Sequence, residues 1–104
     1  MKLSNTETIA NQTISETLGI ARGSTVRSRN IGRDIFASLK NIVGGEIEEY
    51  TKLQADAREQ ALKRMISDAQ RLGADAVVNV RFTTSVVAQG ASEMLAYGTA
   101  VKLK

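Results

Sequence analysis

The chain is 104 residues long, enough for one domain and too short for two. Its 14 Lys and Arg against 11 Asp and Glu give a net charge of +3, which is too mild an excess to indicate nucleic-acid binding. His and Cys are both absent, so the sequence excludes disulfides, thiolate or imidazole metal ligands, and Ser–His or Cys–His catalysis within this chain.

The chain shows no signal for membrane insertion or export. No apolar run approaches the roughly 18 residues of a membrane span, and the first residues lack the apolar stretch of a secretory signal. With cysteine absent as well, we expect a soluble cytoplasmic protein without a membrane partner.

Residues 1–29 are typical of extended structure. Residues 6–9 are compatible with a short strand, and the apolar residues of 14–26 predict a longer one. Gly19 and Gly23 interrupt this longer segment, and glycine inside a strand indicates a bulge or the close approach of another backbone. We therefore expect a bent or irregular strand.

A short helix is predicted over residues 31–42. Its apolar positions are spaced at four, four and three, namely Ile31, Ile35, Leu39 and Ile42. The pair Gly44-Gly45 ends this helix, because glycine supplies the left-handed conformation that a helix stop requires.

A second helix, from Glu46 to Leu72, is the strongest local prediction. Residues spaced by three or four form its mainly apolar stripe, namely Ile47, Tyr50, Gln54, Ala57, Ala61, Met65, Ala69 and Leu72. Gly73 follows in the position of a C-cap. The helix would be about 39 Å long at 1.5 Å per residue, against a diameter of roughly 33 Å for a compact domain of this size. We therefore expect it to overhang its sheet and to contact a neighbouring subunit.

Two strands are predicted in the last third of the chain. Residues 76–82 read as a strand buried on both faces, with 83–87 as its continuation, and turn residues separate it from a last strand over 93–103. In the last strand, small side chains share one face, where a helix can pack closely: Met94, Ala96, Gly98 and Ala100. The order β–α–β–β predicts an α+β fold, with helices on one side of an antiparallel sheet.

A set of short matches runs in order along the chain. They are Asn30-Ile31, Arg33-Asp34, Ile42-Val43-Gly44-Gly45, Tyr50, Ala57-Arg58-Glu59, Ala61, Leu72-Gly73-Ala74-Asp75-Ala76-Val77-Val78 and Gly98-Thr99-Ala100-Val101. In these segments the chain resembles the YbjQ family, small bacterial proteins labelled heavy-metal-binding and of unknown function. The resemblance covers nearly the whole chain, as a single YbjQ-like domain over residues 1–104.

The resemblance implies a particular subunit and assembly. The subunit would have two layers, a β-α-β-β core with a three-stranded antiparallel sheet and a long helix, like a dodecin subunit. Five such subunits would join in a ring, a homopentamer, with extra short strands helping assembly.

The family's metal label fits this chain poorly. Members commonly carry acidic residues after the Val-Val strand, where this chain has Arg81 and Thr83. Glu46, Glu48 and Glu49 form the densest acidic cluster, and compensation of the positive helix end accounts for them. A weak hard-cation site is the alternative. We assign no metal residue and no cofactor.

Four polar residues inside the matched segments are candidate ligand-binding residues: Arg33, Asp34, Tyr50 and Arg58. Each lies on or beside an otherwise apolar helix face, so they are suited to a small anionic ligand held between the two helices or between subunits. The alternative is structural, with the charged members in buried or interfacial ion pairs.

A basic stretch contains Arg22, Arg27, Arg29 and Arg33 without an intervening acid. Guanidinium groups suit phosphate or carboxylate, and a ring would multiply the patch. Pairing between subunits or a solvated edge is the simpler interpretation. The stacking aromatics of single-strand binders are missing, so nucleic acid is not an expected partner.

The leading hypothesis is a non-enzymatic, ring-forming cytoplasmic protein with a structural or ligand-binding role. The alternative is an anion- or metal-binding module whose sites form at subunit interfaces. No spacing of Tyr, Lys, Asp or Glu pairs two residues for acid–base chemistry, so no catalytic residue is assigned.

Overall fold

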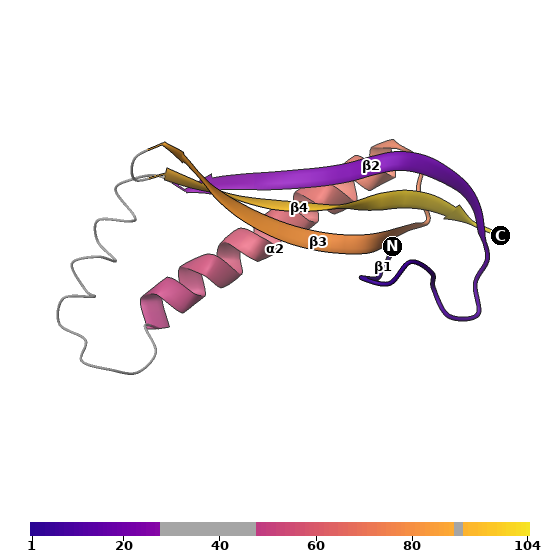
Figure 1. Ribbon diagram of the computed structural model, residues 1–104, viewed down its shortest axis with the longest axis horizontal. Helices are drawn as coiled ribbons and strands as arrows, with labels where there is room; N and C mark the ends of the chain where they lie inside the picture. Colours follow the sequence, from indigo (N-terminus) through magenta and orange to yellow (C-terminus); the bar gives the residue numbers. More distant parts are fainter. Residues whose placement is uncertain (28–47, 89–90) are drawn as a thin grey trace.

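The computed structural model describes residues 1–27, 48–88 and 91–104. These residues form the α+β arrangement of Figure 1, in which helix α2 lies against one face of a four-stranded sheet. The elements in chain order are β1 (Lys2–Leu3), β2 (Ile14–Arg27), α2 (Glu48–Arg71), β3 (Ala76–Ala88) and β4 (Ala91–Leu103). The short helix predicted over 31–42 lies outside the described residues.

The sheet is mixed, with strand order β1-β3-β4-β2. The three long strands are antiparallel, as predicted, but β1 adds to the outer edge of β3 in parallel, with Leu3 opposite Val77. The backbone N–H of Ser4 continues this pairing by donating to the carbonyl of Val77 at 3.0 Å. The expectation of a three-stranded antiparallel sheet was therefore wrong. The short strand expected over residues 6–9 is also wrong, because residues 4–13 contain no strand.

Strand β2 is irregular, as its glycines predict. Its pairing with β4 shifts register at two places near its start, and Gly19 has a φ of 126°. Gly23 serves the close approach of α2, because a methyl group there would overlap the backbone of Ala61 and Met65. The sequence pattern thus indicated both the distortion and the contact.

Helix α2 packs on the sheet through small side chains spaced by four residues. Ala57, Ala61, Met65 and Ala69 are buried against β2 and β4, which lets the two backbones lie close together. At the C-terminus Gly73 has a φ of 81°, and the N–H of Ala74 donates to the carbonyl of Ala69 at 3.0 Å. This is a Schellman ending, so the predicted glycine C-cap is confirmed.

The core lies in two places, one on each face of the sheet. The larger cluster fills the space between α2 and the sheet, with the small residues of β4 contributing as predicted. The smaller cluster consists of Ala76, Val78 and Val101, which pack with Ile9, Ile14 and Leu103. Among the residues that the structure describes, Ile9, Ile14 and Leu103 cover only one end of the second face. We call the remainder of that face, away from α2, the open face.

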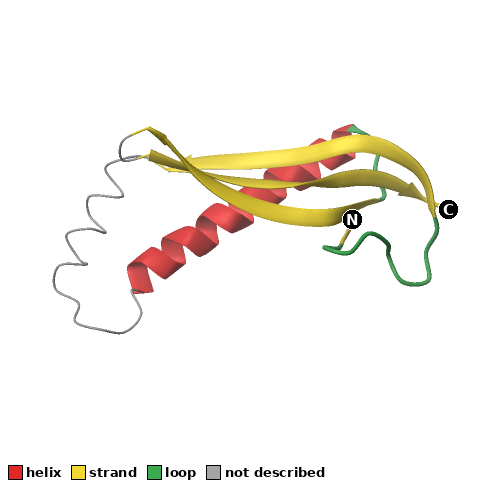
Figure 2. Ribbon diagram, viewed as in Figure 1, coloured by secondary structure: helices red, strands yellow, loops and turns green. Residues whose placement is uncertain are grey.

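The described part of the chain is elongated. Its radius of gyration is 16.8 Å, and it measures 54 × 26 × 16 Å along its principal axes. A compact domain of this length has a radius of gyration near 13 Å. Figure 2 shows α2 crossing the sheet obliquely, with its N-terminal turns well away from the strands, which confirms the predicted overhang. No helix in the described residues has both the length and the apolar character that a membrane crossing requires.

Candidate functional site

The structure describes only part of the ligand-binding site that the sequence predicts. Arg33 and Asp34 lie outside the described residues. Tyr50 belongs to the first turn of α2, with its side chain also outside the described part. Arg58 is exposed on α2, next to the buried Ala57. The four-residue site therefore stays a prediction.

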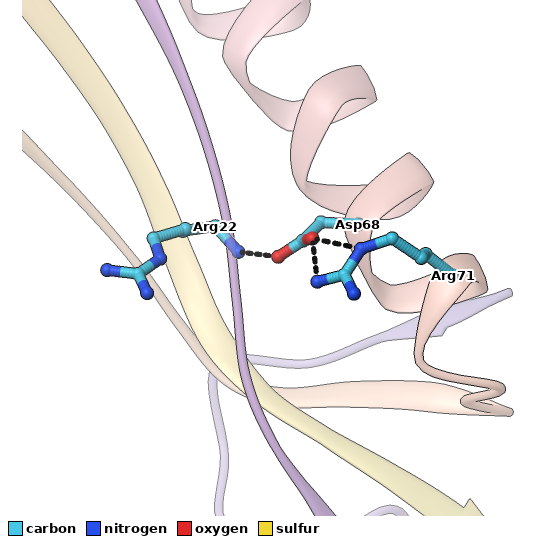
Figure 3. Close-up of polar contacts among 3 residues, drawn as sticks. All are labelled: Arg22, Asp68 and Arg71. Carbon is cyan, nitrogen blue, oxygen red and sulfur yellow. Dashed lines mark hydrogen bonds and ion pairs between the residues drawn. The ribbon is translucent and has the colours of Figure 1, made fainter.

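A polar junction joins α2 to β2 (Figure 3). Oδ2 of Asp68 accepts a hydrogen bond from the backbone N–H of Arg22 at 3.0 Å. Oδ1 of Asp68 accepts two from Arg71, from Nη2 at 2.8 Å and from Nε at 3.2 Å. One turn earlier on α2, Arg64 donates to the carbonyl of Ser24 at 2.5 Å. Because β2 is an edge strand, these contacts satisfy backbone groups that have no neighbouring strand.

The junction is structural rather than reactive. The guanidinium of Arg71 and the backbone N–H of Arg22 hold the pKa of Asp68 below its ordinary value, so this carboxylate remains ionised at neutral pH. Its oxygens are already engaged by three donors. Asp68 therefore has little capacity to act as a general base. Sequence reasoning missed this junction, because no local pattern pairs α2 with the edge of β2.

A β-bulge in β3 decides which side chains reach the open face. Val78 pairs with Thr99 and Arg81 with Tyr97, so three steps along β3 match two steps along β4. The additional residue is accommodated at Asn79, whose φ is 54°. In an unbroken strand Arg81 would share the face of α2, and the bulge turns it to the open face.

The bulge creates a row of three polar side chains across the sheet. Arg22 of β2 lies opposite Tyr97 of β4, and Tyr97 lies opposite Arg81 of β3. We call these three residues the arginine row. In Figure 3 the guanidinium of Arg22 points away from Asp68 and α2. Directly opposed residues project to the same face of a sheet, so the row lies on the open face.

A shallow pocket of about 290 Å³ lies beside this row. It is lined by Ile20, Asn79, Arg81, Tyr97, Gly98 and Thr99. Arg81 is held in place at its edge, because Nη1 donates to the carbonyl of Asn5 at 2.9 Å and to that of Val80 at 3.2 Å. Arg81 stood out in the sequence as a departure from the family pattern, and Gly98 and Thr99 as part of a matched segment. Asn79 was missed, since nothing local predicts a bulge there.

The far end of the sheet, near the connection from β3 to β4, exposes apolar side chains. Val26, Val86 and Val87 are 57%, 80% and 54% exposed. The register places Val26 opposite Glu93 and Val86 opposite Ser92, so all three lie near the same end of the sheet. We call these three residues the apolar end.

The described residues do not form a heavy-metal site. Within residues 1–27, 48–88 and 91–104, no three Asp or Glu residues lie close enough to share a cation. The whole chain lacks the thiolate and imidazole ligands that soft and borderline metals prefer. The acidic cluster that begins at Glu46 falls outside the described side chains. The side chains that the structure describes therefore do not supply the ligands that a soft or borderline heavy metal requires.

Comparisons with known proteins place this chain in a family. The YbjQ family model, described as "Putative heavy-metal-binding", matches residues 1–104. A "UPF0145 protein" of Halorubrum lacusprofundi is 60% identical over 104 residues, covering all of both chains. One from Archaeoglobus fulgidus is 60% identical over 102 residues, covering 98% of this chain and 94% of its own. One from Photobacterium profundum is 59% identical over 98 residues, covering 94% and 95%. The relatives are thus archaeal as well as bacterial.

A solved structure shares the fold. It is a protein of unknown function from Pediococcus pentosaceus, assigned to the DUF74 family, and it is similar to this chain with a TM-score of 0.65. The match covers 100% of this chain and 98% of the other at 14% identity, so it supports the fold alone. The full-length family match and the close relatives lead to one conclusion: this chain belongs to the YbjQ (UPF0145) family.

Proposed function

We propose that this chain is a non-enzymatic cytoplasmic protein that assembles with copies of itself and serves a structural or ligand-binding role. The observation that carries the proposal is the apolar end, where Val26, Val86 and Val87 are all more than half exposed. Contiguous exposed apolar side chains at one place on a small protein mark an interaction surface. A second copy of the chain is the simplest partner for this surface, because it requires no other protein.

The elongated shape supports the same proposal. A subunit of 54 × 26 × 16 Å has a large surface for its volume and buries less of its chain than a compact domain of equal length. Self-association restores that burial. The number of subunits, five in a closed ring, comes from the family resemblance and not from the subunit's geometry.

The free edge of β2 is a poor surface for this association. Asp68 and Arg64 already occupy the backbone groups of Arg22 and Ser24 on that edge. A second strand would have to displace charge-assisted hydrogen bonds before it paired. The proposal therefore assigns assembly to the apolar side chains of the sheet end rather than to strand addition along the middle of β2.

The absence of enzymatic activity belongs to the same proposal. His and Cys are missing from the whole chain, and Asp68, whose pKa is shifted, is engaged in holding α2 to β2. Displaced pKa values occur at catalytic sites and in structural ion pairs alike, and the pKa of Asp68 is lowered by its hydrogen bonds to Arg71 and to the backbone of Arg22.

Native mass spectrometry on the untagged protein, with light scattering in solution, tests the assembly. We expect the mass of five chains for the wild type. We expect Val86→Lys to release smaller species, because a charge buried at the interface is not compensated. Gln60→Lys, which adds the same charge to the exposed outer side of α2, serves as the control and keeps the assembly. A monomeric wild type, or equal masses for all three proteins, would overturn the proposal.

Binding of an anion is the second candidate function. Arg22 and Arg81 place two guanidinium groups on the open face without a carboxylate in the adjoining pocket. Oxyanions are the ligands that guanidinium groups bind best. Metal binding has weaker support, since the described residues do not supply its ligands.

A further inference from the structure

The geometry points to the arginine row and its pocket as a binding site for a small organic oxyanion, a carboxylate or phosphate monoester with an apolar part. This inference rests on the anion-binding candidate above and names its site and ligand class. It does not rest on assembly, because the apolar end comprises different residues from the arginine row.

The spacing of the row suits one small ligand. Neighbouring strands lie about 4.8 Å apart, so the Cα atoms of Arg22 and Arg81 are separated by roughly 10 Å, with Tyr97 between them. Arg81 anchors its guanidinium toward Asn5, on the side of β3 away from β4, so Arg22 is the side chain left to extend over Tyr97 toward the pocket. The adjoining volume of about 290 Å³ lies just below the usual range for ligand pockets, roughly 300–1,000 Å³, so it suits only a small ligand.

The donors of the row remain available for a ligand. Arg81 uses Nη1 for the carbonyls of Asn5 and Val80, which fixes the guanidinium while Nη2 and Nε stay unengaged by the described residues. The side chain of Arg22 is exposed, and within the described ranges it has no hydrogen-bond partner. Arg81 thus supplies a fixed cation at the edge of the pocket, and Arg22 supplies an adaptable one that can reach over Tyr97.

The remaining surface explains why the ligand should carry an apolar part. Tyr97 is 37% exposed, and Ile20 beside it is 65% exposed. Thr99 completes this wall with a hydroxyl group. An apolar body lying on Tyr97 and Ile20 would remove both from water, whereas free inorganic phosphate would gain only the arginines.

Two-dimensional amide NMR titrations of the ¹⁵N-labelled protein test the site. The probes are sodium benzoate and inorganic phosphate, each added at constant ionic strength with chloride as the balancing anion. We expect saturable shifts at residues of the row and its pocket, stronger for benzoate than for phosphate. No saturable shift with either probe, or shifts spread evenly over all basic residues, would overturn the inference.

Charge-removing variants identify the residues responsible. Arg22→Gln and Arg81→Gln should each weaken benzoate binding about tenfold, the loss expected for one charge-assisted hydrogen bond. Lys63→Gln removes the same charge from the exposed side of α2 and should bind as the wild type does. Equal affinity of all variants would remove the row from the site. If Arg81→Gln fails to fold without its anchor to Asn5, Arg22→Gln decides the test by itself.

Measuring the mass of each variant separates this inference from the assembly proposal. A monomeric wild type that still binds benzoate through Arg22 and Arg81 supports the site and overturns the assembly. An assembled protein that binds neither benzoate nor phosphate supports the assembly and overturns the site. Loss of assembly in Arg22→Gln would show that the row is an intersubunit contact, and would overturn the inference.

Discussion

Gly23 determines how closely β2 and α2 can approach. The space beyond its Cα is filled by backbone atoms of Ala61 and Met65, which cannot move aside as a flexible side chain can. The neighbouring contacts also use small groups, since Ala21, Ala61 and Ala96 are completely buried in the same cluster. At the scale of single residues, the fold depends on the absence of side-chain volume at these positions.

Gly23→Ala should therefore be strongly destabilising although it adds one methyl group. We expect a loss of about 1–3 kcal/mol in the free energy of unfolding, as for overpacked cores, measured by urea denaturation at fixed protein concentration. Ser24→Ala is the matched control, because the adjacent side chain points to the other face, and it should change stability by less than about 0.5 kcal/mol. Equal stability of the two variants would mean that α2 is not so closely packed on β2.

At the scale of elements, α2 and β2 are joined by polar contacts as well as by packing. Asp68 and Arg64, four residues apart on α2, meet the backbone of β2 at Arg22 and Ser24. This contact satisfies an exposed strand edge from within the same chain. It also prevents α2 from sliding along β2, because the two hydrogen bonds form together only at one position of the helix relative to the strand.

Asp68→Asn should weaken this link in a pH-dependent way. The pKa of Asp68 is lowered in the folded state, so its stabilising contribution is present above the unfolded value near 4 and disappears as pH falls through the folded value. We expect the variant to be less stable than the wild type by about 1 kcal/mol at neutral pH, allowing for partial exposure. The difference should shrink in acid, and urea denaturation across pH measures it.

Asp56→Asn is the control for this experiment, because Asp56 is exposed on the same helix. Its stability should follow that of the wild type across the same pH range. If the difference between Asp68→Asn and the wild type stayed constant down to about pH 3, the ionised carboxylate would not be the stabilising group.

At the scale of the whole molecule, both the shape and the exposed surface favour self-association. The subunit is longer and thinner than a compact domain, and its far end presents Val26, Val86 and Val87 to solvent. Both features support the proposed self-association.

The midpoint of thermal unfolding should accordingly rise with protein concentration. Association with folded partners stabilises the folded state by mass action, whereas a monomer melts at one temperature at all concentrations. Calorimetry over a wide concentration range measures the effect, and Val86→Lys should abolish it. A concentration-independent midpoint for the wild type would contradict self-association.

Several features of this protein follow from local sequence. The helix stripe of Ala57, Ala61, Met65 and Ala69, the ending at Gly73 and the small-residue face of β4 were all predicted and are all present. Each depends on residues a few positions apart, whose periodicity matches that of the element they form. The four candidate ligand residues were different, because their proximity depends on a part of the chain that the structure does not describe.

The sequence by itself determined the long helix and the three long strands, their order, and the chemistry that this chain lacks. Only the tertiary structure decided the partner of β1, the contact of Asp68 with β2 and the alignment of Arg22 with Tyr97 and Arg81. The physical reason is that these features join residues distant in sequence. The clearest case is the bulge at Asn79, because one additional residue in β3 reverses the face of every side chain that follows it.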